Sequence, residues 1–303
     1  FPENILNEAP YIANLIDYDE NIEIVRNAFY SKREQGRLAI VCGSYEYTGA
    51  CILSAKAAYR SGVGYIRLYV PKAILETVRN AVMIDMPEIV VIGVGEYDNK
   101  YFTADDLYIA EDINKSDACI IGSGIGRDMS TEVFINSILK QINIPTVIDA
   151  DGLNILANEQ IELPQNTILT PHPKEASRLL NCSLEDVLAN IEQSAQRIAI
   201  KYNCITVLKS HRTVVVSSDG KTYHNTTGNS ALAKAGSGDV LAGMIAGFVA
   251  QNMSIFEASV LGVYLHGLAG DLAKEDLSAY GVLASDTIRY IPLAINSYLN
   301  SNV

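Results

Sequence analysis

From Leu38 onward the chain repeats one pattern: a short apolar run, a glycine-bearing turn, and a segment whose apolar residues recur with the period of a helix. Apolar runs of this length are typical of buried strands. We expect strands at residues 38–42, 65–70, 89–94, 118–121, 144–148, 167–169 and 205–208. Because apolar strands alternate with helices, the pattern predicts an α/β fold with a mostly parallel central sheet and helices on both faces.

The helix-period segments predict helices at residues 50–61, 72–81, 132–141, 239–250, 255–274 and 284–299. A hairpin is expected over residues 214–223, with its turn at Asp219 and Gly220. The polar N-terminal region predicts only one helix, over residues 22–29. No stretch resembles a linker, a low-complexity tract or a repeat, so we expect a single domain over residues 1–303.

Composition narrows the classes of partner. The formal net charge of -12 is unsuited to nucleic acid or an anionic membrane surface. No apolar run approaches the ~18 residues of a membrane span, and no N-terminal stretch has the order of a secretory signal. The five cysteines are scattered without a CxxC pair, which is typical of thiols in a reducing compartment. We therefore expect a cytoplasmic protein that binds neither nucleic acid nor membrane.

The most distinctive segment is a polar, glycine-rich stretch at residues 225–239 that runs into an apolar segment carrying Gly243 and Gly247. This order predicts a loop that leads into a buried helix. Gly236 and Gly238 permit backbone conformations that a β-carbon forbids, and the free N–H groups at a helix start form an anion site. Asp239 then lies at the anion site. A helix-capping carboxylate is the simpler interpretation, and a general base held beside a phosphate is the other.

Unusual residues also follow the predicted strand ends, at residues 43–49, 122–127, 149–154, 170–175 and 209–213. Ligands of an open parallel sheet bind beyond the carboxyl ends of its strands, so we expect these segments to converge on one crevice. Neither Gly43 nor Gly122 begins a P-loop, and Arg127 stands where the dinucleotide fingerprint requires glycine. The remaining Gly-x-Gly-x-Gly turn is explained equally well as a tight connection between strand and helix.

The combination of segments is more specific. Residues 235–239, followed by Val-Leu-Ala-Gly, are similar to the C-terminal signature of ribokinase-like enzymes, and within that superfamily the chain resembles the ADP- or ATP-dependent NAD(P)H-hydrate dehydratases. The matching pieces follow the family's order over about residues 38–250: 47–50, 122–127, 149–154, 171–175, 209 with 213, 227–229 and 235–239. Two segments depart from the family: Glu46 and Tyr47 lie in a loop that varies among relatives, and residues 210–212 are bulkier than expected.

The resemblance implies a single-domain ribokinase-like fold and an enzyme that repairs hydrated NADH or NADPH. A nucleotide, ADP in preference to ATP, would phosphorylate the hydroxyl of the hydrated nicotinamide ring in its S form, and elimination of phosphate would restore NADH or NADPH with release of AMP. It further implies Mg²⁺, held mostly by phosphates and waters. A homo-oligomer, with a tetramer suspected, is also implied.

The resemblance assigns roles to individual residues. Asp239 is the expected catalytic base and also a substrate contact. The other expected substrate contacts are Ala50, Gly126 and His172. The expected nucleotide-binding residues are Lys209, Thr213, Asn229, Gly236, Ser237 and Gly238. Glu175 and Asp149 are candidates for holding the metal through water, although the simpler interpretation is that Glu175 favours the first turn of a helix opened by Pro173 and that Asp149 caps the next helix.

Two other functions remain open from the residues alone. A small-molecule kinase of the same fold, acting on a vitamin-precursor hydroxyl, would need the same Asp239 and the same anion site. A nucleotide-sensing binding protein on an inactive kinase scaffold is disfavoured, because Asp239 stands in an intact glycine turn. His172 and the turn at residues 122–127 favour the dehydratase through the family resemblance.

Overall fold

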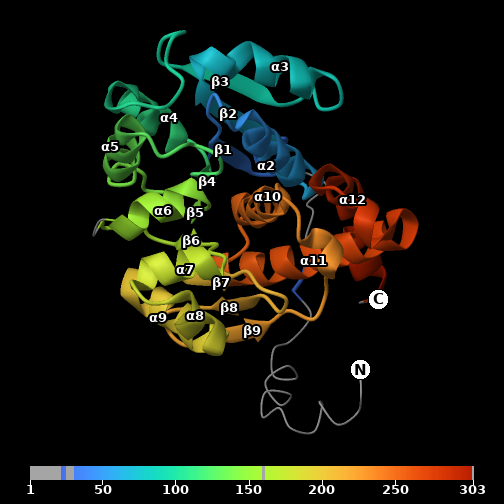
Figure 1. The fold of residues 1–303 in the computed structure, drawn as a ribbon. Helices are drawn as coiled ribbons and strands as arrows, with labels where there is room; N and C mark the ends of the chain where they lie inside the picture. The colour runs from blue at the N-terminus through green and yellow to red at the C-terminus, as the bar shows by residue number, and fades with distance from the viewer. Residues whose placement is uncertain (1–21, 25–30, 159–160, 302–303) are drawn as a thin grey trace, which may run out of the picture.

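The computed structural model describes residues 22–24, 31–158 and 161–301, and a nine-stranded sheet forms the centre of this described part (Figure 1). Its strands are β1 (Arg37–Val41), β2 (Tyr65–Pro71), β3 (Val90–Val94), β4 (Ala118–Ile121), β5 (Thr146–Ile148), β6 (Thr167–Leu169), β7 (Ile205–Leu208), β8 (Val214–Val216) and β9 (Thr222–His224). They lie in the order β3-β2-β1-β4-β5-β6-β7-β8-β9. Strands β1 to β7 pair in parallel, and β8 and β9 add an antiparallel hairpin to the β7 edge.

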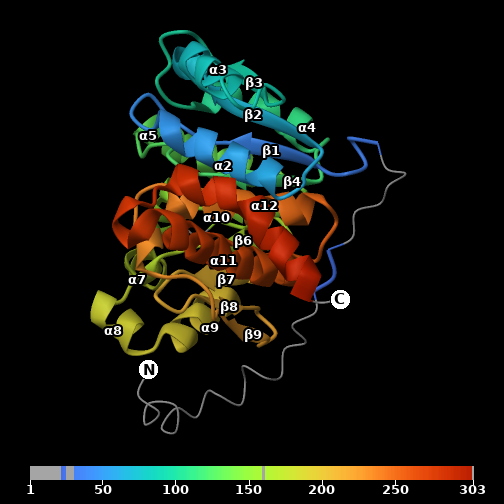
Figure 2. The ribbon, with the colours of Figure 1, turned by 90° about the vertical axis from the view of Figure 1, so that its right-hand side faces the viewer.

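The helices cover both faces of the sheet, as Figure 2 shows for the face that carries α2, α10, α11 and α12. The helical elements are α2 (Thr48–Arg60), η1 (Lys72–Ile74), α3 (Leu75–Met83), η2 (Ala104–Ile109), α4 (Ala110–Ile113), α5 (Met129–Ile138), α6 (Asp151–Asn158), α7 (Pro173–Leu180), α8 (Leu184–Ala189), α9 (Ile191–Tyr202), η3 (Ser230–Leu232), α10 (Ser237–Ala250), α11 (Ile255–Gly281) and α12 (Ala284–Ser301). One apolar core joins α2, α10, α11 and α12 to the sheet, and a second core joins α5, α6, α7 and α9 to the opposite face. The α/β prediction is confirmed. None of the described helices is long and apolar enough to span a bilayer.

Helix α10 is packed closely against α2. Every residue from Val240 to Ala250 is buried. A Cβ on Gly243 would lie 2.3 Å from the Ser54 carbonyl oxygen, and one on Gly247 would lie 3.1 Å from the Ala58 carbonyl oxygen. The two glycines therefore let the backbones of the two helices approach, which fixes the position of the α10 N-terminus over the sheet.

The apolar pattern located most of the strands. The bounds of β4, β6 and β7 are the predicted ones, and the predicted hairpin is formed by β8 and β9. Strand β5 begins at Thr146, two residues later than predicted, after Pro145, which has no N–H to donate to a ladder. The expected helix at residues 22–29 lies largely outside the described part of the chain.

Two of the site segments run into short helices, α6 from Asp151 and α7 from Pro173. The helix opened by Pro173, one of the two interpretations of Glu175, is confirmed, although neither helix followed from the apolar pattern. Both helices have only eight residues, too few for a clear helical period. Helix α11 also runs beyond the predicted end at residue 274, through a kink at Ser278, where φ is 62°.

Candidate active site

The loops after β1 and β4 meet at the carboxyl edge of the sheet. From β1 the chain crosses to β2 on one side, while β4 pairs with β1 on the other side, so this is the point where the strand order reverses. Gly43 donates its backbone N–H to the Ser123 carbonyl at 2.9 Å. The Ser44 hydroxyl donates to the Gly124 carbonyl at 2.8 Å. These bonds confirm that the two segments converge on one crevice.

The glycines of the turn after β4 have separate structural reasons. Gly122, Gly124 and Gly126 have φ values of 115°, 59° and 87°, which an L side chain rarely adopts. A Cβ on Gly122 would lie 2.4 Å from the Asp149 carbonyl oxygen, and one on Gly124 would lie 2.7 Å from the Ala50 Cβ. Gly126 donates its N–H to the Asp151 carboxylate at 3.1 Å. The turn is thus held between the β1 loop and the start of α6.

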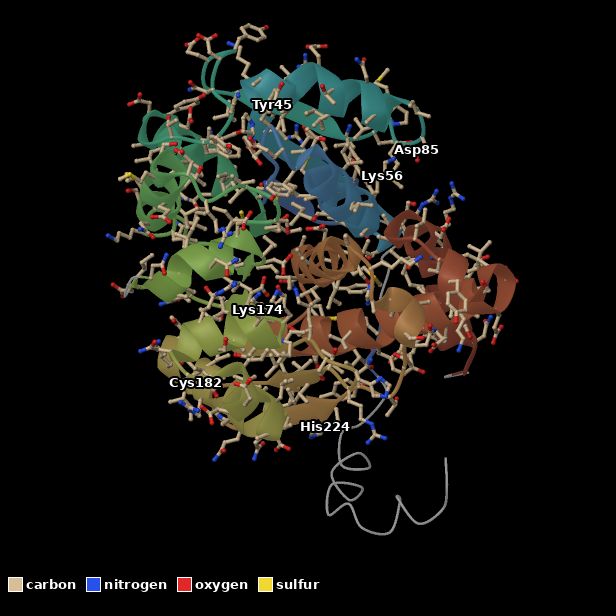
Figure 3. All side chains as sticks on the ribbon, viewed as in Figure 1. Tyr45, Lys56, Asp85, Lys174, Cys182 and His224 are labelled. Carbon is tan, nitrogen blue, oxygen red and sulfur yellow. The ribbon has the colours of Figure 1, made fainter. Side chains whose placement is uncertain are left out.

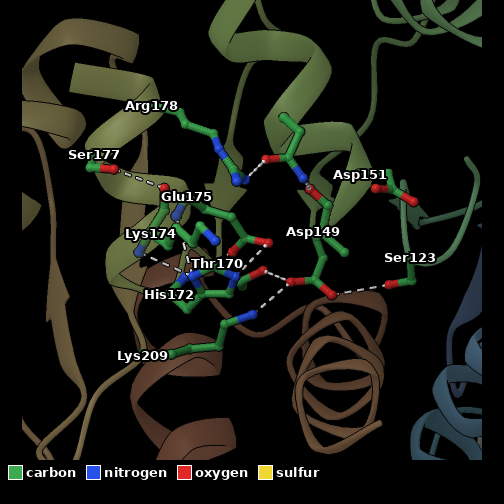
Figure 4. A network of polar contacts seen from close by, with 12 residues as sticks. Ser123, Asp149, Asp151, Thr170, His172, Lys174, Glu175, Ser177, Arg178 and Lys209 are labelled. Carbon is green, nitrogen blue, oxygen red and sulfur yellow. Dashed lines mark hydrogen bonds and ion pairs between the residues drawn. The ribbon is translucent and has the colours of Figure 1, made fainter. Parts of the chain in front are cut away.

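A buried ion pair lies below this turn (Figure 4). Asp149, which follows β5, is only 1% exposed. One of its carboxylate oxygens accepts hydrogen bonds from the Thr170 hydroxyl at 2.6 Å and the Lys209 ammonium at 3.0 Å, and the other accepts from the Ser123 hydroxyl at 3.1 Å. Burial raises the pKa of Asp149, but Lys209 and the hydroxyl donors outweigh burial and lower the pKa overall. The pair is therefore charged, and both oxygens of the Asp149 carboxylate accept hydrogen bonds.

His172 and Glu175 form a reciprocal cap at the start of α7. The His172 Nδ1 accepts hydrogen bonds from the backbone N–H groups of Lys174 and Glu175 at 3.1 and 3.2 Å. In return, the backbone N–H of His172 donates to the Glu175 carboxylate at 2.9 Å. Burial, followed by the charge of Lys209, lowers the pKa of His172. Because Nδ1 is an acceptor, the proton of the neutral ring is on Nε2, which lies 3.3 Å from the second Glu175 oxygen.

Glu175 therefore lies in the first turn of α7 and takes part in its cap, as the structural interpretation of this residue expects. Its carboxyl group also has unusual electrostatics, because burial raises its pKa to about 7, with Lys209 opposing the increase and Asp149 adding to it.

The predicted buried helix is present as α10, which begins at Ser237, two residues earlier than predicted, with Gly236 at its N-cap in a left-handed conformation (φ 89°). No side chain caps this end. Asp239 is the third residue of the helix, and burial raises its pKa to about 7, with Asp149 adding to the increase and Lys209 opposing it. A carboxyl group with this pKa can hold or release a proton near neutral pH, as a general base requires.

One prediction about the glycine turn was wrong. Gly238 is a helical residue and its φ is not positive. The absence of a side chain serves another purpose, because a Cβ on Gly238 would lie 3.1 Å from the Lys209 Nζ. Gly238 thus leaves room for the ammonium group against the start of α10.

These groups line a cavity of about 800 Å³. It is lined by most of the predicted site residues: Asp149, His172, Glu175, Lys209, Thr213, Asn229, Gly236, Ser237, Gly238 and Asp239. Ala50 and Gly126 are not among its lining residues: Gly126 belongs to the glycine turn, and Ala50 lies beside it. The Asn229 side chain accepts from the Ala231 N–H at 2.8 Å and donates to Asp271 at 2.7 Å, so it also orders the cavity wall.

The sequence interpretation missed His266. This histidine of α11 is buried, lines the cavity, and places its Nε2 3.3 Å from the Ser237 hydroxyl at the first residue of α10. Burial, with a smaller effect of Lys209, lowers its pKa to about 4, so the ring is neutral. A single histidine inside the otherwise apolar stretch of α11 was the available signal.

The donor set fits a magnesium ion that is held by phosphates and waters. Within the described residues, no three histidine, cysteine or carboxylate side chains converge in a metal-binding arrangement. Asp149 already accepts three hydrogen bonds, and Glu175 accepts one from His172. Mg²⁺ usually keeps several waters and uses one or two carboxylates beside substrate phosphates, so these two groups could contact it through water.

The family model described as NAD(P)H-hydrate dehydratase matches residues 38–293. The chain belongs to this family. It is 38% identical over 258 residues to the ADP-dependent (S)-NAD(P)H-hydrate dehydratase of Neisseria meningitidis serogroup B, covering 83% of this chain and 82% of that protein. It is 34% identical to the bifunctional NAD(P)H-hydrate repair enzyme Nnr of Moorella thermoacetica over 90% of this chain and 51% of that protein. The chain thus spans about half the length of the bifunctional members of the family.

Solved structures agree with this assignment. The ADP/ATP-dependent NAD(P)H-hydrate dehydratase of Bacillus subtilis, co-crystallised with ATP and Mg²⁺, superposes with a TM-score of 0.77 at 27% identity, covering 90% of this chain and 94% of that chain. A ribokinase-like superfamily protein from Enterococcus faecalis gives a TM-score of 0.79 at 28% identity, covering 92% and 93%. The predicted ribokinase-like fold is confirmed.

Proposed function

We propose that the protein dehydrates the S form of hydrated NADH and NADPH, with ADP as the phosphoryl donor and AMP and phosphate as by-products. The observation that carries the proposal is the position of Asp239: a carboxyl group with a pKa of about 7, in the first turn of an uncapped helix, beside the Lys209 ammonium in one cavity. The relative from Neisseria meningitidis, whose name specifies ADP and the S form, supports the choice of donor and substrate.

In the first step, the oxygen of the substrate hydroxyl attacks the terminal phosphorus of the nucleotide while Asp239 takes the hydroxyl proton. The N–H groups at the start of α10 and the Lys209 ammonium stabilise the negative charge that develops on the transferred group. The Asp149 carboxylate accepts a hydrogen bond from the Lys209 Nζ at 3.0 Å and so holds the ammonium group in position. Mg²⁺, when bound with the nucleotide, supplies further neutralisation of phosphate charge.

In the second step, the phosphorylated hydroxyl leaves as phosphate and the adjacent carbon loses a proton, which restores the ring double bond. The neutral His172 presents its ring at the cavity wall and contributes a hydrogen-bonding group for the nicotinamide half. Ala50 and Gly126, at the glycine turn, offer close backbone approach on the substrate side. Thr213 and Asn229, which also line the cavity, are the proposed contacts of the nucleotide.

A small-molecule kinase would need the same base and anion site. The dehydratase is favoured because the family model and the relatives above are described by this activity. All five cysteines lie in the described part of the chain and are free thiols, which suits a cytoplasmic enzyme. A homo-oligomer belongs to the same proposal.

The test is the absorbance at 340 nm when purified protein is mixed with hydrated NADH, Mg²⁺ and either ADP or ATP. We expect a rise that requires nucleotide, is faster with ADP, and is accompanied by one AMP per NADH formed. A reaction without nucleotide measures spontaneous dehydration. If no absorbance develops with folded protein and either nucleotide, the proposal fails, and ATP-dependent phosphorylation of vitamin-precursor alcohols becomes the next reaction to test.

A further inference from the structure

Two loops at the carboxyl edge of the sheet are tied together and expose aromatic rings. One follows β1 and carries Tyr45 and Tyr47, and the other follows β3 and carries Lys100 and Tyr101. Tyr45 donates its backbone N–H to the Lys100 carbonyl at 3.1 Å, and the Tyr101 hydroxyl donates to Glu46 at 2.8 Å. The rings of Tyr45 and Tyr47 nevertheless remain accessible, at 55% and 57% exposure. Fixed loops that leave their rings in solvent are suited to stacking against a ligand.

Tyr47 and Tyr101 of these loops lie beside the glycine turn after β4. A Cβ on Gly124 would lie 2.8 Å from the Tyr47 Cβ, and one on Gly126 would lie 2.9 Å from the Tyr101 ring. We call Tyr45, Tyr47 and Tyr101 the tyrosine platform. The Lys100 Nζ lies over the Tyr45 ring, 4.7 Å from its centre, so a cation accompanies the exposed aromatic surface. The nearby Glu46 carboxylate is engaged by Tyr101.

The platform is also close to the cavity. Gly122, at one end of the glycine turn, contacts the carbonyl of Asp149, while Gly124 and Gly126 contact the platform. The chain from Gly122 to Gly126 can span at most roughly 14 Å. In the view of Figure 3, Tyr45 is labelled in the upper half of the molecule, and Lys174 of α7 is labelled in the lower half.

We propose that the tyrosine platform binds the adenosine half of the hydrated dinucleotide. This inference rests on the proposed function. The reacting nicotinamide ring must reach Asp239, and the phosphates of the co-substrate must occupy the α10 N-terminus, so the second nucleotide half of the substrate needs another surface. Purine rings stack on exposed tyrosines, and the Lys100 ammonium suits the pyrophosphate or the 2′-phosphate of NADPH.

The experiment compares two substrates: hydrated NADH, and the hydrated form of reduced nicotinamide mononucleotide, which lacks the adenosine half. The variants are Tyr45→Ala, Tyr47→Ala and the double substitution. Stacking on one aromatic ring is worth enough that the double variant should raise the KM for hydrated NADH roughly 10- to 100-fold. Its kcat, its KM for ADP and its KM for the truncated substrate should stay unchanged. Tyr280→Ala, which removes a ring that is 93% exposed on α11, serves as the matched control.

The outcomes separate the two proposals. If the wild-type protein converts neither substrate, the proposed function fails. If it converts both and the double variant keeps its KM for hydrated NADH, the platform is overturned. An equal loss with both substrates would mean that the tyrosines only support the glycine turn, and a rise confined to the KM for ADP would mean that they bind the co-substrate; either result also overturns the inference.

Discussion

A cavity lies at the carboxyl ends of the parallel strands, and a groove of similar volume but different chemistry lies at their amino ends. The cavity at the carboxyl ends has a volume of about 800 Å³, and a groove of about 890 Å³ lies at the amino ends, lined by Arg37 and Asp117 among others. Each contains an ion pair. The Arg37 and Asp117 side chains are 40% and 35% exposed, whereas those of Lys209 and Asp149 are 20% and 2% exposed.

This difference in exposure decides what the neighbouring groups can do. Arg37 binds Asp117 through two guanidinium nitrogens, at 2.6 and 3.0 Å, and Asp117 also accepts from the Arg37 backbone N–H. That pair is complete and solvated. At the other end, Lys209 lies near three carboxyl groups, and burial raises the pKa of both Asp239 and Glu175 to about 7. The raised pKa values thus follow from desolvation, and neither the volume of a cavity nor the presence of an ion pair predicts them.

The largest effect is expected at Asp239. Asp239→Asn should lower kcat about 10²- to 10⁴-fold, because the substrate hydroxyl loses its base. In the wild type, activity should fall as pH decreases through about 7, where Asp239 becomes protonated. The pH dependence of kcat/KM measures this ionisation. An Asn variant with normal kcat would remove Asp239 from the chemistry.

The Asp239 carboxyl group should also make stability depend on pH, in the direction opposite to its effect on activity. Because the folded state raises the pKa of Asp239 above its ordinary value, the folded protein binds this proton more tightly than the unfolded chain does. Its contribution to stability is therefore lost as pH rises from about 4 to about 7. Asp239→Asn should be more stable than the wild type above pH 7 and similar to it near pH 4, which denaturant unfolding at both values can measure.

The two ion pairs should differ in what their loss costs. Lys209→Met leaves Asp149 buried without its cation, and we expect it to lower the free energy of unfolding by about 3–5 kcal/mol. Arg37→Met removes a solvated pair and should cost about 1 kcal/mol or less. Urea unfolding of the two variants tests the contrast. Equal losses would contradict it, and the Lys209→Met loss should shrink at low pH, where Asp149 can take up a proton.

A smaller effect is expected for Gly238→Ala. The new methyl group would lie 3.1 Å from the Lys209 Nζ and shift the ammonium by a few tenths of an ångström. Since this weakens one charge-assisted hydrogen bond, kcat should fall up to about tenfold. The unfolding free energy should be unchanged or slightly higher, because alanine favours a helix. A large loss of stability would show that Gly238 matters for the fold instead.

The smallest expected effect concerns His266. His266→Leu removes the contact with the Ser237 hydroxyl, and we expect a few-fold to tenfold lower kcat. His266→Gln, whose amide can replace Nε2, should recover most of it. In the double variant with Ser237→Ala, the two losses should not add, because both remove the same hydrogen bond. Additive losses would assign His266 a purely structural role.

The sequence was informative where one physical rule dominates. Strands β4, β6 and β7 are fully buried and consist mostly of apolar residues, so their limits followed from the pattern alone. The segments after these strands had to meet at one edge of the sheet, and most of the predicted residues line the cavity there. The raised pKa of Asp239 could not be predicted from the sequence, because it depends first on burial and then on Asp149 and Lys209, which follow β5 and β7.

The remaining features depend on contacts between distant parts of the chain. His266 meets Ser237 only because α11 packs against α10. Gly238 leaves room for the Lys209 ammonium group, which approaches from the end of β7. A rule about local backbone conformation cannot predict this contact. The cap formed by His172 and Glu175 could have been recognised, since the two residues have the spacing of a capping box, but histidine is an unusual N-cap residue.

Because α10 packs against α2, a substitution in this part of the core should also affect the proposed reaction. Gly243 and Gly247 do not line the cavity, yet a methyl group on Gly243 would overlap the Ser54 carbonyl and force the helices apart. Ser54 in turn donates its hydroxyl to the carbonyl of Asp239 at 3.1 Å. In a saturation mutagenesis screen scored by growth, Gly243 should therefore be as intolerant as a catalytic position, even for alanine, although it lies one full turn of helix beyond Asp239.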